Sequence, residues 1–250
     1  MTKTNTRLLF SILVVLSTLL FYTGCVDTGV QNIDSSFDFH SEVSVANLVE
    51  NGGAATISID DQQFGAVSVG ATTSDSDLQS GNKSMLVSFA ASGFGNETFS
   101  ITVDTEKKIR FYIVSDGTEQ SIIKDVQRYT WQTSDSEEGE GIFTDSTAQV
   151  AIFNASPDLE VEALMVVANG DTSYIEFDDP IATESRCSYF SLATTSSVNY
   201  SLGIIYDDAI YATVPLTAEP RSRYTVAVYG SATEVDENTM TVKYSVFTDD

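Results

Sequence analysis

The sequence predicts an all-β protein: two tandem immunoglobulin-like antiparallel β-sandwich domains behind an N-terminal signal segment. First, apolar and polar residues alternate over short runs, such as 42–48, 55–60 and 99–104. This period places one face of a strand on a core and the other in water. Second, these runs are rich in Thr, Val, Ile, Tyr and Phe, and turn-forming residues separate them. Third, after the signal no stretch of about a dozen residues carries an apolar stripe of helical period.

The N-terminal segment has the layout of an export signal. Lys3 and Arg7 precede an apolar run over residues 8–22. This run is shorter than the roughly 20 residues that a membrane-spanning helix needs. It therefore fits the apolar region of a signal peptide.

The end of this segment, Thr23-Gly24-Cys25, resembles the lipobox of bacterial lipoproteins. The resemblance implies removal of residues 1–24, acylation of Cys25 and, with Val26 next, outer-membrane sorting. The chain departs from the pattern just before the small pair, where a leucine is usual and Phe21-Tyr22 stands here. The alternative is an ordinary secretory signal that is cut elsewhere. Residues 25–40 are expected to form a flexible tether.

The composition restricts the partners. The chain has 12 Lys and Arg against 36 Asp and Glu, a formal net charge of -24. Nucleic-acid binders need clustered basic residues, so this class is excluded. Anionic lipid would also repel such a surface, so contact with the membrane is expected only through the lipid on Cys25.

The body divides into an N-terminal sandwich over 41–131, an acidic linker or loop over 132–147, and a C-terminal sandwich over 148–250. A weak internal repeat supports this division. Residues 43–48 parallel 150–155, and residues 99–114 parallel 211–229. Two tandem copies of one kind of sandwich explain both similarities.

The second half opens with residues 149–158, which contain Asn154-Ala155-Ser156-Pro157-Asp158. This motif resembles the start of the bacterial domain of unknown function family 4397 (DUF4397), and the similarity extends over about 148–235. It implies an extracytoplasmic immunoglobulin-like module without established chemistry. On the residues alone, Asn154, Ser156, Pro157 and Asp158 predict a strand-ending turn, because Asn, Ser and Asp bond to nearby backbone and Pro fixes φ.

We expect no catalytic residues, no metal site and no cofactor. His40 is the only histidine, and a nucleophile needs a base within reach. Cys187 lacks a partner if Cys25 is acylated, and it is predicted to be a small buried residue within a strand over 186–190. The acid pairs at 178–179 and 207–208 are adjacent, which on a strand would put the two side chains on opposite faces.

These observations favour a non-enzymatic cell-envelope lipoprotein of the outer membrane, serving adhesion, scaffolding or protein binding. An envelope protein or a glycan is a possible partner. One alternative is a carbohydrate- or calcium-binding module, in which Tyr129 and Trp131 stack on a sugar or acidic loops hold the ion. A closing core strand is the favoured role for Tyr129 and Trp131. The other alternative is an acid-based hydrolase.

Overall fold

The computed structural model describes residues 39–116, 119–127, 146–232 and 242–249. Residues His40–Asp250 form one compact unit. The described part is all-β apart from one short 3-10 helix, Glu50–Gly52. No helix in the described ranges is long and apolar enough to span a membrane. The predicted all-β sandwich fold is confirmed.

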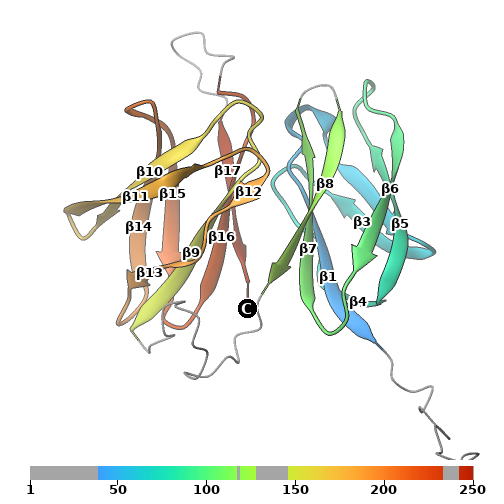
Figure 1. Cartoon of the computed structure of the whole chain (residues 1–250), viewed down its shortest axis with the longest axis horizontal. Helices are drawn as coiled ribbons and strands as arrows, with labels where there is room; N and C mark the ends of the chain where they lie inside the picture. The colour runs from blue at the N-terminus through green and yellow to red at the C-terminus, as the bar shows by residue number, and fades with distance from the viewer. Residues whose placement is uncertain (1–38, 117–118, 128–145, 233–241, 250) are drawn as a thin grey trace, which may run out of the picture. The chain divides into compact units, whose positions relative to one another are not determined.

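The first sandwich consists of two four-stranded sheets, ordered β4-β1-β7-β8 and β3-β2-β5-β6 (Figure 1). Its strands are β1 (His40–Asn47), β2 (Ala55–Ile59), β3 (Gln62–Val67), β4 (Ser76–Gln79), β5 (Gly81–Phe89), β6 (Asn96–Val103), β7 (Lys108–Ser115) and β8 (Gln120–Gln127).

The second sandwich has the sheets β12-β9-β16-β17, in which β13 also pairs with β9, and β11-β10-β14-β15. Its strands are β9 (Thr147–Asn154), β10 (Val161–Ala168), β11 (Asp171–Ile181), β12 (Ser185–Arg186), β13 (Phe190–Ala193), β14 (Val198–Tyr206), β15 (Ala209–Ala218), β16 (Arg223–Tyr229) and β17 (Lys243–Thr248).

The two sandwiches repeat one topology. The strand orders become the same when β9–β12 take the places of β1–β4 and β14–β17 take those of β5–β8, which leaves β13 as an extra strand of the second sandwich. The sequence repeat falls on equivalent strands, since 43–48 belongs to β1 and its end, and 150–155 to β9 and its end. Each sandwich contains one parallel pair among its otherwise antiparallel strands. β1 runs parallel to β7, with Val43 opposite Ile109, and β9 runs parallel to β16, with Val150 opposite Tyr224.

Each sandwich has its own core between its two sheets. In β7, for example, Ile109, Phe111 and Ile113 are 0–1% exposed and belong to the first core. Burying each such side chain contributes about 1.5–3 kcal/mol.

The opposite face of β7 is also buried, contrary to the prediction that it lies in water. Tyr112 and Val114 join a third apolar cluster with Phe153 of β9 and Phe247 of β17. The Tyr112 and Phe153 rings stack with centroids 4.2 Å apart. The sheets β4-β1-β7-β8 and β12-β9-β16-β17 therefore contact each other through the faces that do not line their own cores.

Tight hairpins set the register of the second sandwich. Asn169 and Gly170 have φ of 52° and 89° and join β10 to β11 in a two-residue loop. Asp207 and Asp208, with φ of 47° and 60°, do the same between β14 and β15. Positive φ at both positions is the conformation that suits two-residue hairpins. Asp207 and Asp208 are thus turn residues, and their expected placement on a strand was wrong.

Candidate functional site

Each sandwich has one sheet whose outer face lies in solvent, and the two outer faces differ in chemistry. On the β3-β2-β5-β6 sheet this face is mostly hydroxylic. Its hydroxyl-bearing side chains are Thr56, Ser84, Ser88, Thr98, Ser100 and Thr102. Leu86 is the large apolar residue among them, with 40% of its surface exposed. A polar outer face is usual for a sheet that packs on one side only.

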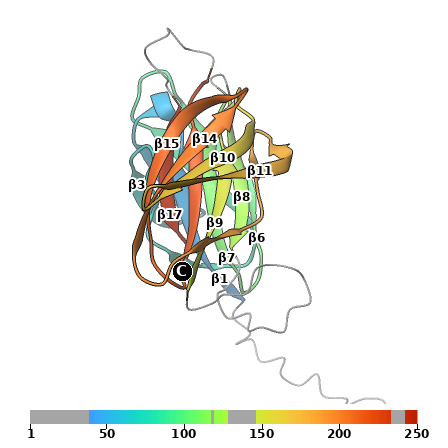
Figure 2. The same cartoon turned by 90° about the vertical axis from the view of Figure 1, so that its left-hand side faces the viewer.

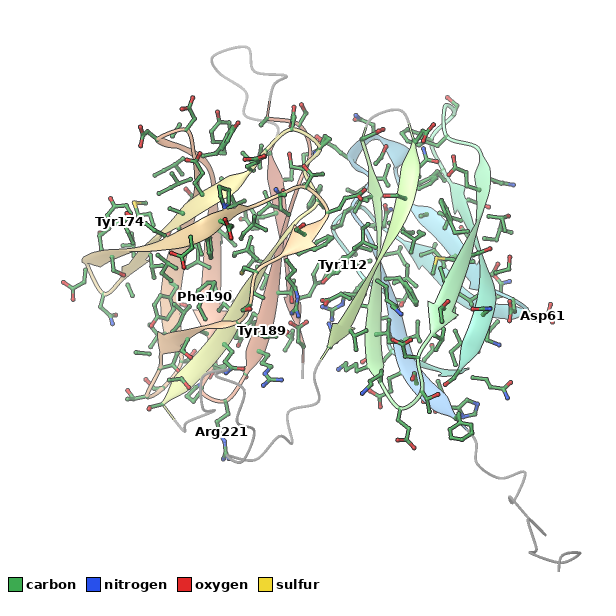
Figure 3. The ribbon with its side chains drawn as sticks, in the orientation of Figure 1. Asp61, Tyr112, Tyr174, Tyr189, Phe190 and Arg221 are labelled. Atoms are coloured by element: carbon green, nitrogen blue, oxygen red, sulfur yellow. The ribbon has the colours of Figure 1, made fainter. Side chains whose placement is uncertain are left out.

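The corresponding face of the β11-β10-β14-β15 sheet is apolar at its centre. Figure 2 looks onto this sheet. Met165 of β10 lies between Tyr174 of β11 and Gly203 of β14. We call the exposed or half-buried side chains of this face the apolar strip: Met165, Val167, Tyr174, Ile205 and Ile210. Tyr174 is 62% exposed and Ile210 39%, and Figure 3 shows Tyr174 pointing away from the core.

Gly203 leaves room for the Met165 side chain to lie close to the backbone of the sheet. A Cβ atom at Gly203 would lie 3.2 Å from both Cβ and Cε of Met165 and 3.5 Å from Cγ2 of Ile210. The Met165 side chain therefore lies across the backbone of Gly203. A glycine inside a strand weakens the strand, and a close approach of this kind is one reason to find it there.

The charged side chains on the four strands that carry the apolar strip are all acidic. Strands β10, β11, β14 and β15 contain no Lys or Arg. Glu176 lies beside Ala163, in the row that also holds Ile205. Glu162 lies close to the β14–β15 turn, where its Oε2 accepts the N–H of Asp207 at 3.1 Å. One end of the apolar strip is thus acidic.

A buried polar cluster lies between the two sheets that face each other, β4-β1-β7-β8 and β12-β9-β16-β17. We define it as Arg110, Gln127, Tyr189, Thr225 and Asp249. Oδ1 of Asp249 accepts hydrogen bonds from Arg110 Nη1 at 2.6 Å and Gln127 Nε2 at 2.9 Å. Its Oδ2 accepts from Tyr189 Oη at 2.9 Å and Thr225 Oγ1 at 2.6 Å. The carboxylate of Asp249 therefore joins β7 and β8 of one sandwich to β16 of the other.

Beside this cluster lies a second ion pair, between Asp125 Oδ1 and Arg186 Nε at 3.3 Å. Burial raises the pKa of Asp125, and the Arg186 charge only partly opposes this shift. Burial also raises the pKa of Tyr112 and Tyr189, so both hydroxyls stay protonated at neutral pH. Within the described ranges, Asp125 Oδ2 and Tyr112 Oη have no hydrogen-bond partner. The arrangement holds two sheets together.

The motif residue Asn154 and its counterpart Asn47 make the same hydrogen bonds. Oδ1 of each accepts the N–H two residues on, of Ser156 and Val49, at 3.1 Å. Nδ2 of Asn154 donates to the carbonyls of Leu159 and Ile181, and Nδ2 of Asn47 to those of Gly53 and Val67. Both side chains are fully buried. Each one ties the end of the first strand to the end of the third.

The remaining motif residues lie close to Asn154. Asp158 Oδ1 accepts the N–H of Ala232 at 2.6 Å, and its Oδ2 accepts from Ser231 Oγ at 2.6 Å. Asp158 thus fixes the segment after β16, and its Oδ1 also accepts the Ser156 hydroxyl at 3.2 Å within the predicted turn. Ser156 is fully buried and Pro157 half-buried. Asn154, Ser156 and Asp158 all use their side chains in hydrogen bonds within the second sandwich.

Cys187 lies in a break between two strands, and the prediction of a strand through it was wrong. β12 and β13 both pair with β9, and one extra residue separates their registers. The Sγ atom of Cys187 accepts the N–H of Ile152 at 3.1 Å. Burial raises the pKa of the thiol, which makes it less reactive. His40 is the first residue of β1, and Asp178 and Asp179 are exposed on β11.

Several predicted positions lie outside the described residues. These are the signal segment, Cys25, most of the tether and of the 132–147 loop, Tyr129 and Trp131. Across the described ranges, no group of three or more His, Cys, Asp or Glu side chains is placed to hold a metal ion. The sequence reasoning missed the apolar strip and the buried polar cluster.

No family model and no curated protein matches this chain, so the resemblance to family 4397 stays a prediction. One similar solved structure is a family CBM26 carbohydrate-binding module of Eubacterium rectale Amy13K in complex with maltoheptaose, at 9% identity and a TM-score of 0.25 over 83% of this chain and 96% of the other. Another is a proposed cell adhesion protein from Bacteroides eggerthii, at 8% identity and 0.23 over 85% and 95%. Neither TM-score is high enough to support an argument.

Proposed function

We propose that this protein is a non-enzymatic lipoprotein of the bacterial outer membrane that binds another component of the envelope. The observation that carries the proposal is the apolar strip on the open face of the second sandwich. Exposed apolar groups that gather on one face mark interaction sites more often than scattered ones do. The equivalent face of the first sandwich, which has the same topology, is hydroxylic and serves as an internal reference.

The anchor in this proposal is Cys25, with the lipid on its sulfur and new amino group. One acyl chain gives only marginal membrane binding, whereas several together hold a protein stably, at about 0.8 kcal/mol per buried CH₂. A formal net charge of -24 gives anionic lipid no electrostatic hold on the body. The lipid would therefore supply the whole of the attachment.

The buried polar cluster supports a binding role without chemistry. Its carboxylate accepts hydrogen bonds from four donors, and its tyrosine, Tyr189, stays protonated. Such a cluster fixes the contact between two sheets, and its carboxylate is engaged in that contact. Fixed contact between the sandwiches limits the freedom that a partner must remove on binding.

Fractionation of cells that express Cys25→Ala tests the anchor. We expect the wild-type protein in the membrane fraction and Cys25→Ala in the soluble fraction. Cys187→Ala is the matched control, because it also removes one thiol and should leave the protein on the membrane. Retention of Cys25→Ala on the membrane would remove the lipoprotein from the proposal.

A glycan-binding role on the same face is the second candidate. It is favoured by Tyr174, an aromatic ring exposed on a sheet, because such rings can stack on sugars. Glycan-array binding that Tyr174→Ser abolishes would favour this candidate over a protein partner.

A further inference from the structure

We propose that the apolar strip binds a basic segment of an envelope protein, with Lys or Arg side chains facing the acids at its end. The inference rests on the proposed function, because it names the partner of the face described above. It is drawn from the chemistry of the strip, the charge around it and the edge strand beside it.

The chemistry of the apolar strip is aliphatic. Four of its five members are Met, Val or Ile, and Tyr174 is the one aromatic ring. A site for sugars would combine aromatic rings with several polar side chains that converge on hydroxyl groups. Aliphatic side chains bury the apolar groups of a protein, and methionine adapts to partners of different shape.

The charge selects a cationic partner. Glu162, Glu176, Asp207 and Asp208 lie at one end of the apolar strip, and β10, β11, β14 and β15 supply no basic residue. A basic segment would be attracted from a distance and oriented, since complementary potentials raise association rates and reject wrong partners. A second copy of this chain would bring the same acids against these and be repelled.

The neighbouring edge strand fits the same occupant. β11 ends the β11-β10-β14-β15 order, so one of its sides has no partner strand in that sheet. It carries Asp171, Glu176, Asp178 and Asp179 over 11 residues. Charges on an edge strand prevent pairing with like strands. An extended basic segment that pairs with this edge would place alternate side chains on the same face of the sheet, next to Tyr174 of the strip.

A peptide-binding experiment on the full-length protein in mild detergent tests the proposal. The probe is a short labelled peptide in which lysine alternates with valine and phenylalanine. Its binding to the protein is measured by fluorescence anisotropy. A peptide with glutamate for lysine is the charge control, and maltoheptaose is the neutral glycan competitor. We expect the lysine peptide to bind, the glutamate peptide not to bind, and maltoheptaose not to compete.

Matched variants locate the binding. Tyr174→Ser should lower the affinity for the lysine peptide about tenfold, as truncation of a central aromatic contact does. Glu176→Gln combined with Asp178→Asn should lower this affinity by a smaller factor. It should also reduce the dependence of the affinity on salt. Leu86→Ser and Asp61→Asn alter an exposed leucine and an exposed acid of the first sandwich, and should leave affinity unchanged.

Three results would overturn the proposal. Equal affinity of the lysine peptide for Tyr174→Ser and Leu86→Ser would remove the apolar strip as its site. Equal binding of the glutamate peptide would remove the charge argument. Binding of maltoheptaose that needs Tyr174 would replace the basic segment by a neutral glycan. Whichever of these results is obtained, fractionation of Cys25→Ala tests the lipid anchor independently of the binding face.

Discussion

Replacement of Asp249 by alanine should destabilise the protein by about 3–5 kcal/mol, the cost of breaking a buried ion pair by removing one partner. Asp249 is 2% exposed, and its carboxylate accepts four hydrogen bonds. The Arg110 side chain, 4% exposed, would keep its charge and lose the oxygen at 2.6 Å. Its bond to the Thr248 carbonyl and its place over the Phe247 ring do not neutralise that charge. The loss is a large part of the 5–15 kcal/mol that holds a typical protein folded.

Urea unfolding followed by far-UV circular dichroism measures this loss as a change in midpoint at constant slope. Asp179→Ala is the control, because it removes an exposed carboxylate from β11 and should change stability by about 0.5 kcal/mol or less. Asp249→Ala combined with Arg110→Met should recover part of the loss, since no orphaned charge remains. A loss from Asp249→Ala no larger than that of Asp179→Ala would refute the reasoning.

Three further predictions concern single buried groups, each followed by urea unfolding. Asp125 has a folded-state pKa raised above the unfolded value of about 3.9, so its stabilising effect is complete below that value and is lost as pH rises through the folded pKa. Asp125→Asn should flatten the fall in stability over this window, and an unchanged slope would contradict the assignment. Tyr112→Phe should change stability by about 1 kcal/mol or less, whereas Tyr112→Ala should cost about 3–5 kcal/mol, because the ring packs and the hydroxyl is unpartnered among the described residues. Asn47→Ala and Asn154→Ala should each lower the free energy of unfolding by about 2–4 kcal/mol, since buried backbone groups lose their partners. An unchanged stability at either position would show that its turn does not need the amide.

The sandwich fold and its repetition could be predicted because they depend on local alternation and on turns. The 43–48 and 150–155 runs fall on the equivalent strands β1 and β9. The sequence also contained the central pair of the apolar strip. Once Asn169-Gly170 is taken as a two-residue hairpin, counting outward puts Met165 opposite Tyr174.

The contact between the sandwiches could not be predicted in the same way. Alternation in 109–114 indicates which residues face one core, but not what covers the other face. One signal was available: Val226-Ala227-Val228-Tyr229 is continuously apolar, as in strands buried on both faces. Arg110 and Asp249 are 139 positions apart, and no local pattern links residues at that separation.

Site-specific photo-crosslinking in intact cells tests most directly whether the second sandwich presents the binding face. A photoreactive aromatic residue is introduced in place of Tyr174 and, in a separate strain, in place of Leu86, the exposed leucine on the equivalent face of the first sandwich. The account predicts a discrete adduct with another envelope component from position 174 and none from position 86. The same adducts from both positions, or an adduct from position 86 alone, would contradict it.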